Sequence, residues 1–167
     1  AGKTTAIIGI AEKGYTTLKL TAHAESGHSS MPAHPSAIGI LARAITALEQ
    51  NQLPSKLAGS AEKTFDFLGP EMGLLEKVLF ANRWLFNGVI ISELQKKTST
   101  AAVIHSTTAI TIIEGGFKEN VIPSKASAVV NFRILPGQNS ADIKNHVIET
   151  VNDPAISVDF MTGSSLK

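Results

Sequence analysis

Two hydrophobic periodicities alternate along this sequence, and their order constrains the fold more than any other feature. Four runs carry apolar residues at every second position, the period of a strand with one buried face: Tyr15–Ala24, Ser106–Glu114, Ala126–Ile134 and Ile156–Phe160. Two other segments repeat apolar residues at three- and four-residue steps, the period of a helix lying on a sheet. The chain therefore reads as strand, helix, two strands, helix, strand.

This order predicts an α+β fold of ferredoxin-like type, an antiparallel four-stranded sheet with both helices on one face. Pro35 suits the first position of the first helix, and its apolar stripe is Ala37, Ile40, Leu41, Ala44, Ile45 and Leu48. Ser140 is predicted to be the N-cap of the second helix, with an inner stripe of Ile143, Val147 and Val151. A further β-rich run, Thr4–Ala11, is expected to form a hairpin with Tyr15–Ala24 through the loop Glu12–Gly14.

The segment between the first helix and the next strand is roughly fifty residues long, too long for an ordinary loop. Residues 53–104 are therefore predicted to be a helical insertion. Within it, Glu71–Gln95 is predicted to be helical, although its many apolar side chains leave little polar face. Such a helix must be covered, either by its own domain or by a second subunit or another domain.

Charge and composition narrow the choice of partner. The 15 basic and 14 acidic residues nearly cancel and no basic run occurs, so neither nucleic acid nor an anionic membrane is an expected partner. The longest charge-free run in the most apolar region, Trp84–Ser92, is far shorter than the ~20 residues of a membrane span. Without cysteine there is no disulfide framework, and the compartment, cytoplasmic or periplasmic and secreted, stays open. The chain starts without a signal-peptide pattern, and we expect it to be an excised part of a longer protein.

Three residues are candidates for a functional site. His28 follows Gly27 at the end of a predicted strand, on a loop that the sheet would hold in place. Asn120 is an amide donor on a Gly-rich loop, and Arg133 is a planar cationic fork on the outer face of a strand. Taken singly, each is more often a structural residue, and only their combination points to a site.

The histidines do not form a recognisable metal site. Imidazole is a common zinc ligand, but no cysteine or well-spaced acidic residue completes a tetrahedral set around His23, His28 and His34. His23 is expected to be a solvated strand residue, His34 a helix-entry residue, and Glu25 part of a solvated turn. No metal ligand is therefore assigned to any position of this sequence.

Several motifs occur in an order that resembles one known family. They are Gly27–Pro32 (GHSSMP), Thr107–Thr111 (TTAIT), Asn120–Pro123 (NVIP) and Val130–Gln138 (VNFRILPGQ). Over essentially its whole length the sequence resembles the dimerisation (lid) domain of the aminoacylase, carboxypeptidase S and succinyl-diaminopimelate desuccinylase family of zinc exopeptidases. Within the insertion, Asn82–Phe86 (NRWLF) resembles the branch of carboxypeptidase S and the secreted N-acyl amino acid hydrolases.

The resemblance implies that residues 1–167 are a single lid domain, inactive alone, of an enzyme that acts on a small peptide or an N-acyl amino acid. Two zinc ions and a general-base glutamate would lie in a separate catalytic domain, because this sequence contains neither a His-x-Asp motif nor a Glu-Glu pair. His28 would stabilise the oxyanion of the reaction, in the neighbouring subunit's active site when the enzyme is a homodimer. Asn120 and Arg133 would hold the terminal carboxylate of the substrate.

Two alternatives stay open. A desuccinylase or deacetylase of the same family would share the chemistry but not the side-chain contacts, and the insertion around Trp84 favours the carboxypeptidase S branch. A free-standing ferredoxin-like regulatory or oligomerisation module would bind a small ligand without catalysis. Titration with amino acids distinguishes these classes, because a regulatory module should bind one of them tightly.

Overall fold

The computed structural model describes residues 12–71 and 73–161. The predicted strand Thr4–Ala11 lies outside them, so its hairpin with the next strand stays a prediction. The elements are, in chain order, β1 (Gly14–His23), β2 (Gly27–His28), α1 (Ala37–Gln50), α2 (Ser60–Leu68), the 3-10 helix η1 (Gly69–Glu71), α3 (Leu74–Ala81), α4 (Arg83–Gln95), α5 (Thr98–Ile104), β3 (Thr107–Gly115), β4 (Val121–Ile122), β5 (Lys125–Ile134), α6 (Ser140–Val151) and β6 (Ile156–Phe160).

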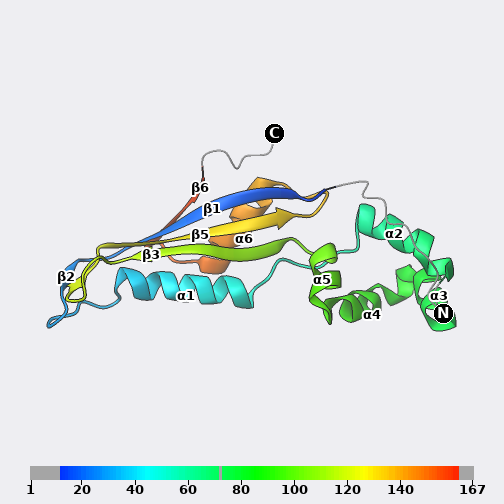
Figure 1. Cartoon of the computed structure of the whole chain (residues 1–167), viewed down its shortest axis with the longest axis horizontal. Helices are drawn as coiled ribbons and strands as arrows, with labels where there is room; N and C mark the ends of the chain where they lie inside the picture. The colour runs from blue at the N-terminus through cyan, green and yellow to red at the C-terminus, as the bar shows by residue number, and fades with distance from the viewer. Residues whose placement is uncertain (1–11, 72, 162–167) are drawn as a thin grey trace.

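Four strands form an antiparallel sheet in the order β3-β5-β1-β6 (Figure 1). Helices α1 and α6 contact each other and pack against the same face of this sheet. The predicted ferredoxin-like α+β fold is therefore confirmed. The inward side chains predicted for β5 are all buried, namely Ala126, Ala128, Val130, Phe132 and Ile134. On the other face Asn131 and Arg133 are more exposed, but Ser127 and Val129 are buried as well.

The hydrophobic core lies between the sheet and the two helices. Its largest fully buried side chains include Phe132 of β5, Leu18 and Leu20 of β1, and Leu48 of α1. Burying a side chain of this size contributes roughly 1.5–3 kcal/mol relative to leaving it exposed. The opposite face of the sheet has no helix over it among the described residues and carries mainly polar and charged side chains. Groups that act on a ligand can therefore be presented on that open face or at the ends of the strands.

Both core helices begin close to the predicted positions, α1 two residues after Pro35 and α6 with its cap one residue before Ser140. The N-cap of α1 is Ser36, whose hydroxyl accepts a hydrogen bond from the Gly39 amide at 3.1 Å, so Pro35 precedes the cap. The N-cap of α6 is Asn139 and not Ser140, which is the first helical residue. Only for α6 does a neighbouring side chain take the capping role predicted for another residue.

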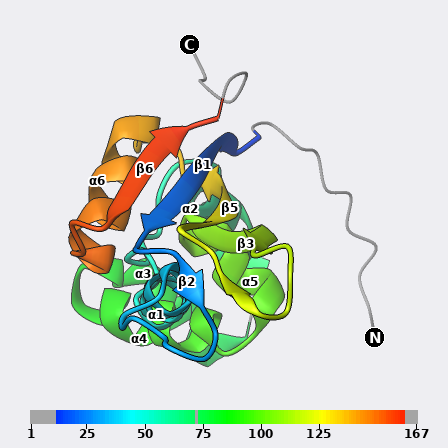
Figure 2. The same ribbon diagram turned by 90° about the vertical axis from the view of Figure 1, so that its left-hand side faces the viewer.

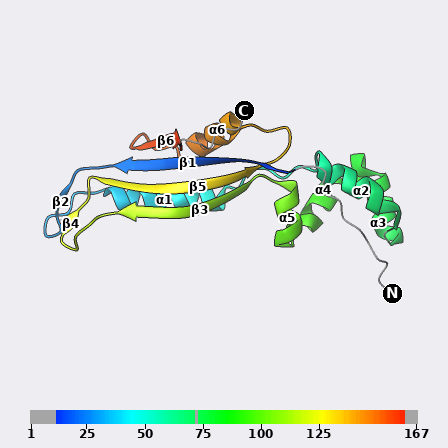
Figure 3. The same ribbon diagram turned by 45° about the horizontal axis from the view of Figure 1, so that its top comes forward.

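The insertion forms its own helical lobe beyond one end of the sheet (Figures 1 and 3). Most of the segment predicted to be helical, Glu71–Gln95, is helical, but it forms two helices, because the chain breaks at Asn82 between α3 and α4. The side-chain amide and the backbone N–H of Asn82 both donate to the Val78 carbonyl, at 2.9 and 3.2 Å, and these bonds end α3.

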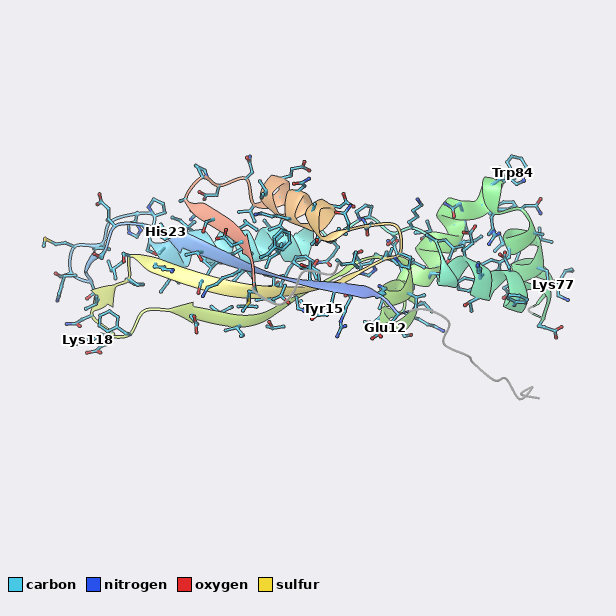
Figure 4. All side chains as sticks on the ribbon, turned by 90° about the horizontal axis from the view of Figure 1, so that it is seen from above. Glu12, Tyr15, His23, Lys77, Trp84 and Lys118 are labelled. Carbon is cyan, nitrogen blue, oxygen red and sulfur yellow. The ribbon has the colours of Figure 1, made fainter. Side chains whose placement is uncertain are left out.

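The lobe's helices are not covered by the rest of the domain. All residues of α3 are described and none is buried, and α4 buries only Ile90. Trp84 is 84% exposed and points away from the lobe (Figure 4). The interpretation that the insertion packs against its own domain is therefore wrong for these two helices. None of the helices in the described part of the chain has the length and hydrophobicity needed to cross a membrane.

Lys13 attaches the lobe to the sheet. Its amine, just before β1, donates hydrogen bonds to the carbonyls of Ala102 and His105 near the end of α5. Burial lowers the pKa of the Lys13 amine from its ordinary value, because desolvation disfavours the charged form. Nearby, the Ser106 hydroxyl accepts from the Leu135 amide at 2.8 Å. These contacts place the lobe at the end of the sheet where β1 begins.

Candidate functional site

Strand β2, which contains His28, lies at the end of the molecule opposite the insertion (Figures 1 and 2). The two-residue strands β2 and β4 pair antiparallel there, with His28 opposite Val121, the residue after Asn120. The Ser29 amide donates to the Asn120 carbonyl at 3.1 Å and extends this pairing by one bond. Two segments that lie far apart in the sequence therefore bring residues 28 and 120 to the same end of the molecule, on neighbouring backbone segments.

A tight turn shapes the chain directly after His28. The Met31 amide donates to the His28 carbonyl at 3.0 Å, which closes a β-turn over residues 28–31. Below the turn, the Ala24 amide donates to the Ser124 carbonyl at 3.0 Å, and the His23 amide donates to the Ala155 carbonyl at 2.9 Å. These bonds hold the chain between the β2–β4 pair and the four-stranded sheet. The His28 loop is therefore a short extension of a rigid scaffold.

The two side chains at this tip differ in exposure. The His28 ring is exposed, and its Nδ1 lies 2.8 Å from the Ser30 hydroxyl and 3.2 Å from the Ser30 backbone nitrogen. Asn120 is half-buried, and its Oδ1 is buried without a hydrogen-bond partner among the described residues. An unpaired buried polar atom costs about 1–3 kcal/mol. Because Oδ1 is an acceptor, only the NH2 group of the Asn120 side chain can donate to an anionic ligand.

Arg133 lies elsewhere on the sheet. It is paired with Tyr15 on one side and with Thr107 on the other, and its guanidinium lies 5.8 Å from the centre of the Tyr15 ring. A cation over an aromatic face is held by the ring quadrupole. As predicted, the Arg133 side chain is on the outer, open face of the sheet.

The structure separates Arg133 from His28. Tyr15 and His23 stand at opposite ends of β1 (Figure 4), and Arg133 is paired with the first while Lys125 is paired with the second. Lys125 and Arg133 are eight residue steps apart along β5, a distance of roughly 26 Å. His28 lies beyond the Lys125 end of the strand. Because an amide and the carboxylate of the same residue are within about 4 Å, one copy of this chain cannot place both residues on one small substrate.

The other residues that the sequence offered as metal ligands do not form a metal site with His28. His23, Glu25 and His34 are exposed. Within residues 12–71 and 73–161, no three His, Asp or Glu side chains are close enough to hold a metal ion together. The described residues thus offer no ligand set for zinc, and no chemical step through a metal is derived for them.

Two contacts of the candidate residues were not visible in the sequence. The stacking of Tyr15 with Arg133 depends on the pairing register of β1 and β5, which no local pattern reveals. Ser30 belongs to the motif around His28, but its contact with the ring exists only because residues 28–31 form a tight turn.

Similar proteins identify the family. Residues 10–159 match the peptidase dimerisation domain family. The chain is 40% identical over 159 residues to N-fatty-acyl-amino acid synthase/hydrolase PM20D1.1 of Danio rerio, and 43% identical over 156 residues to probable carboxypeptidase S-like 2 of Dictyostelium discoideum. These alignments cover 95% and 93% of this chain but only 31% and 30% of the relatives. The chain thus spans about a third of the length of these proteins.

Solved structures share the fold at low sequence identity. Human carnosine dipeptidase 1 aligns with a TM-score of 0.52 and 15% identity, over 93% of this chain and 39% of that one. An M20 family metallo-carboxypeptidase of Sulfolobus solfataricus also aligns with a TM-score of 0.52 and 15% identity, over 88% and 37%. With the match over residues 10–159, these findings place the chain in the family of M20 peptidase dimerisation domains.

Proposed function

We propose that this domain covers the substrate in a zinc-dependent carboxypeptidase or N-acyl amino acid amidohydrolase. His28 would donate to the oxyanion of the reaction, and Asn120 and Arg133 would contact the terminal carboxylate of the substrate. Relatives named as carboxypeptidase S-like and as N-fatty-acyl-amino acid hydrolases support this assignment, because both names denote substrates with an amide bond next to a free carboxylate. The zinc ions and the general base belong to a part of the enzyme outside this chain.

The separation between His28 and Arg133 is the observation that carries the proposal furthest. Both residues belong to motifs shared with the same enzyme family. Arg133 lies near one end of the sheet and His28 lies beyond the other end, with roughly 26 Å of strand between the two ends. A single copy cannot use both on one substrate, whereas two copies arranged as a symmetric dimer can. We therefore assign His28 and Asn120 of one copy, together with Arg133 of the other, to each active site.

The chemistry assigned to each residue follows from its side chain. When an amide is attacked, negative charge grows on the carbonyl oxygen, and a preorganised donor aimed at that oxygen is worth about 10²–10³ in rate. The His28 Nε2–H would be such a donor. The Arg133 fork matches a carboxylate with two parallel hydrogen bonds, and the Tyr15 ring limits the directions in which it can point. An internal peptide bond offers no carboxylate to this fork, which gives selectivity for a chain end.

Two substitutions in the full-length enzyme test these roles. His28→Ala should lower kcat about 10²–10³-fold with little change in KM, because the oxyanion exists only in the transition state. Arg133→Ala should mainly raise KM, because a carboxylate is present in the ground state and the transition state alike.

His23→Ala is the matched control, since His23 is an exposed histidine at the same end of the sheet. It should leave both constants unchanged. A His28→Ala enzyme whose kcat stays within about threefold of wild type, below the range of an oxyanion donor, would contradict the assignment.

A further inference from the structure

We infer that Ser30 is a positioning residue that fixes the tautomer of His28, so that the neutral ring carries its proton on Nε2. The catalytic consequence of this inference rests on the oxyanion role proposed above. The tautomer itself is a property of this chain and can be measured without any activity.

Two groups of Ser30 converge on one nitrogen of the His28 ring. The backbone N–H of Ser30 points at Nδ1 with an N···N distance of 3.2 Å, and the Ser30 hydroxyl lies 2.8 Å from the same atom. A backbone N–H can only donate, so Nδ1 must offer its lone pair as the acceptor. A neutral imidazole has one proton on its two nitrogens, and that proton is therefore on Nε2.

The surrounding backbone keeps the Ser30 N–H aimed at the ring. The turn is closed by the Met31 amide on the His28 carbonyl, and the Ser29 amide is bound to the Asn120 carbonyl. His28 itself is in the β2–β4 pairing, opposite Val121. Since both ends of the turn are hydrogen-bonded, the N–H of Ser30 keeps its direction, and the contacts at Nδ1 leave Nε2 on the far side of the ring.

The tautomer decides whether His28 can act on an oxyanion. With the proton on Nε2, the outer nitrogen presents an N–H to the growing negative charge. With the proton on Nδ1, the outer nitrogen would present a lone pair, which repels that charge. A partner at the inner nitrogen is the general way in which proteins select the reactive tautomer of histidine. Ser30 supplies this partner from two residues along the same chain.

The first test measures the tautomer by ¹⁵N NMR on the 167-residue chain with labelled histidine, at a pH where the ring is neutral. In the wild type, Nδ1 of His28 should show the shift of an unprotonated nitrogen and Nε2 that of a protonated one. Ser30→Ala removes the hydroxyl and keeps the backbone N–H, so it should increase the population with the proton on Nδ1 only by the share that the hydroxyl contributes. Ser29→Ala is the matched control, because the Ser29 hydroxyl makes no hydrogen bond to the described residues, and it should leave the tautomer unchanged.

The second test measures turnover by the full-length enzyme. Ser30→Ala should lower kcat about three- to tenfold with KM unchanged, the effect of losing one neutral hydrogen bond at the ring. Ser30→Thr keeps a hydroxyl and should restore kcat, and Ser29→Ala should match wild type.

The two tests separate the tautomer assigned to His28 from its role at the oxyanion. A wild-type ring with its proton mainly on Nδ1 overturns the inference, and so does a Ser30→Ala enzyme that equals Ser29→Ala while His28→Ala is impaired. A His28→Ala enzyme with normal kcat overturns the oxyanion role instead. In that case the NMR result alone decides whether Ser30 fixes the tautomer.

Discussion

Thr16 and Thr17 are adjacent on β1, yet their hydroxyls have opposite surroundings. Thr16 faces the core and is fully buried, and its hydroxyl has no hydrogen-bond partner among the described residues. Thr17 faces the open side of the sheet, where its hydroxyl accepts from the Asn131 amide at 3.1 Å. A buried hydroxyl without a partner costs about 1–3 kcal/mol, so a residue of the same shape without the hydroxyl suits position 16 better.

Thr16→Val is therefore expected to increase the free energy of unfolding by about 1 kcal/mol, because it removes an unpaired polar atom and keeps the volume of the side chain. For a chain of this size, that gain raises Tm by roughly 2–4 °C. Thr17→Val is the matched control and should reduce stability by about 1 kcal/mol, since Asn131 loses its partner. Urea and thermal unfolding of the 167-residue chain measure both changes. A less stable Thr16→Val chain would mean that the hydroxyl has a partner.

At the scale of elements, long periodic segments could be predicted from the sequence and short ones could not. The inward side chains of β5 alternate without interruption, and the structure buries all of them. Strands β2 and β4 have two residues each, too few for any periodic signal. The proximity of His28 to Asn120 depends on their pairing, so it could not be predicted from local patterns. Residues Thr98–Ile104 form α5 although Ser, Thr and Val are weak helix formers.

The start of α6 shows why cap positions are hard to choose by sequence alone. Asn139 and Ser140 are both favoured at an N-cap. Asn139 is the N-cap because its side-chain oxygen accepts from the backbone amides of Ala141 and Asp142, at 2.8 and 3.0 Å. In return, the Asp142 carboxylate accepts from the backbone N–H of Asn139 at 2.9 Å. This reciprocal arrangement is a capping box.

Substitution of each candidate cap separates the two assignments. Asn139→Ala should reduce the free energy of unfolding by about 1 kcal/mol, because the backbone amides of Ala141 and Asp142 lose their side-chain acceptor. Ser140→Ala changes a first-turn residue without a capping role and should have little effect. Denaturant unfolding of the two variants gives the comparison. Equal losses, or a larger loss for Ser140→Ala, would contradict the observed cap.

On the scale of the whole molecule, the two ends of the domain are different in character. The end with β2 and β4 carries His28 and Asn120, and the opposite end carries the helical lobe (Figure 3). Several large apolar side chains of the lobe are exposed, among them Phe67, Leu74, Leu75, Trp84 and Leu85. Because exposed apolar patches usually mark contact surfaces, we expect the lobe to contact another part of the assembled enzyme and not the substrate at His28 of the same copy.

The proposed division of the active site between two copies can be tested by complementation. Full-length enzyme with His28→Ala and full-length enzyme with Arg133→Ala would each be impaired as a homodimer, because every site lacks one of the two groups. In a mixed dimer, one site combines the intact His28 of the second subunit with the intact Arg133 of the first. The other site of that dimer lacks both groups.

Dissociating the two variants, mixing them in equal amounts and reassociating them should therefore restore activity. Random pairing makes half of the dimers mixed, and each has one intact site of two, so the mixture should reach about a quarter of wild-type activity. A mixture of His28→Ala with the His28→Ala, Arg133→Ala double variant is the control and should stay inactive, since no pairing supplies an intact His28. If the first mixture gains nothing although mixed dimers are demonstrated by mass, both residues act within one copy. The separation of Arg133 from His28 on the sheet would then require a large rearrangement before catalysis.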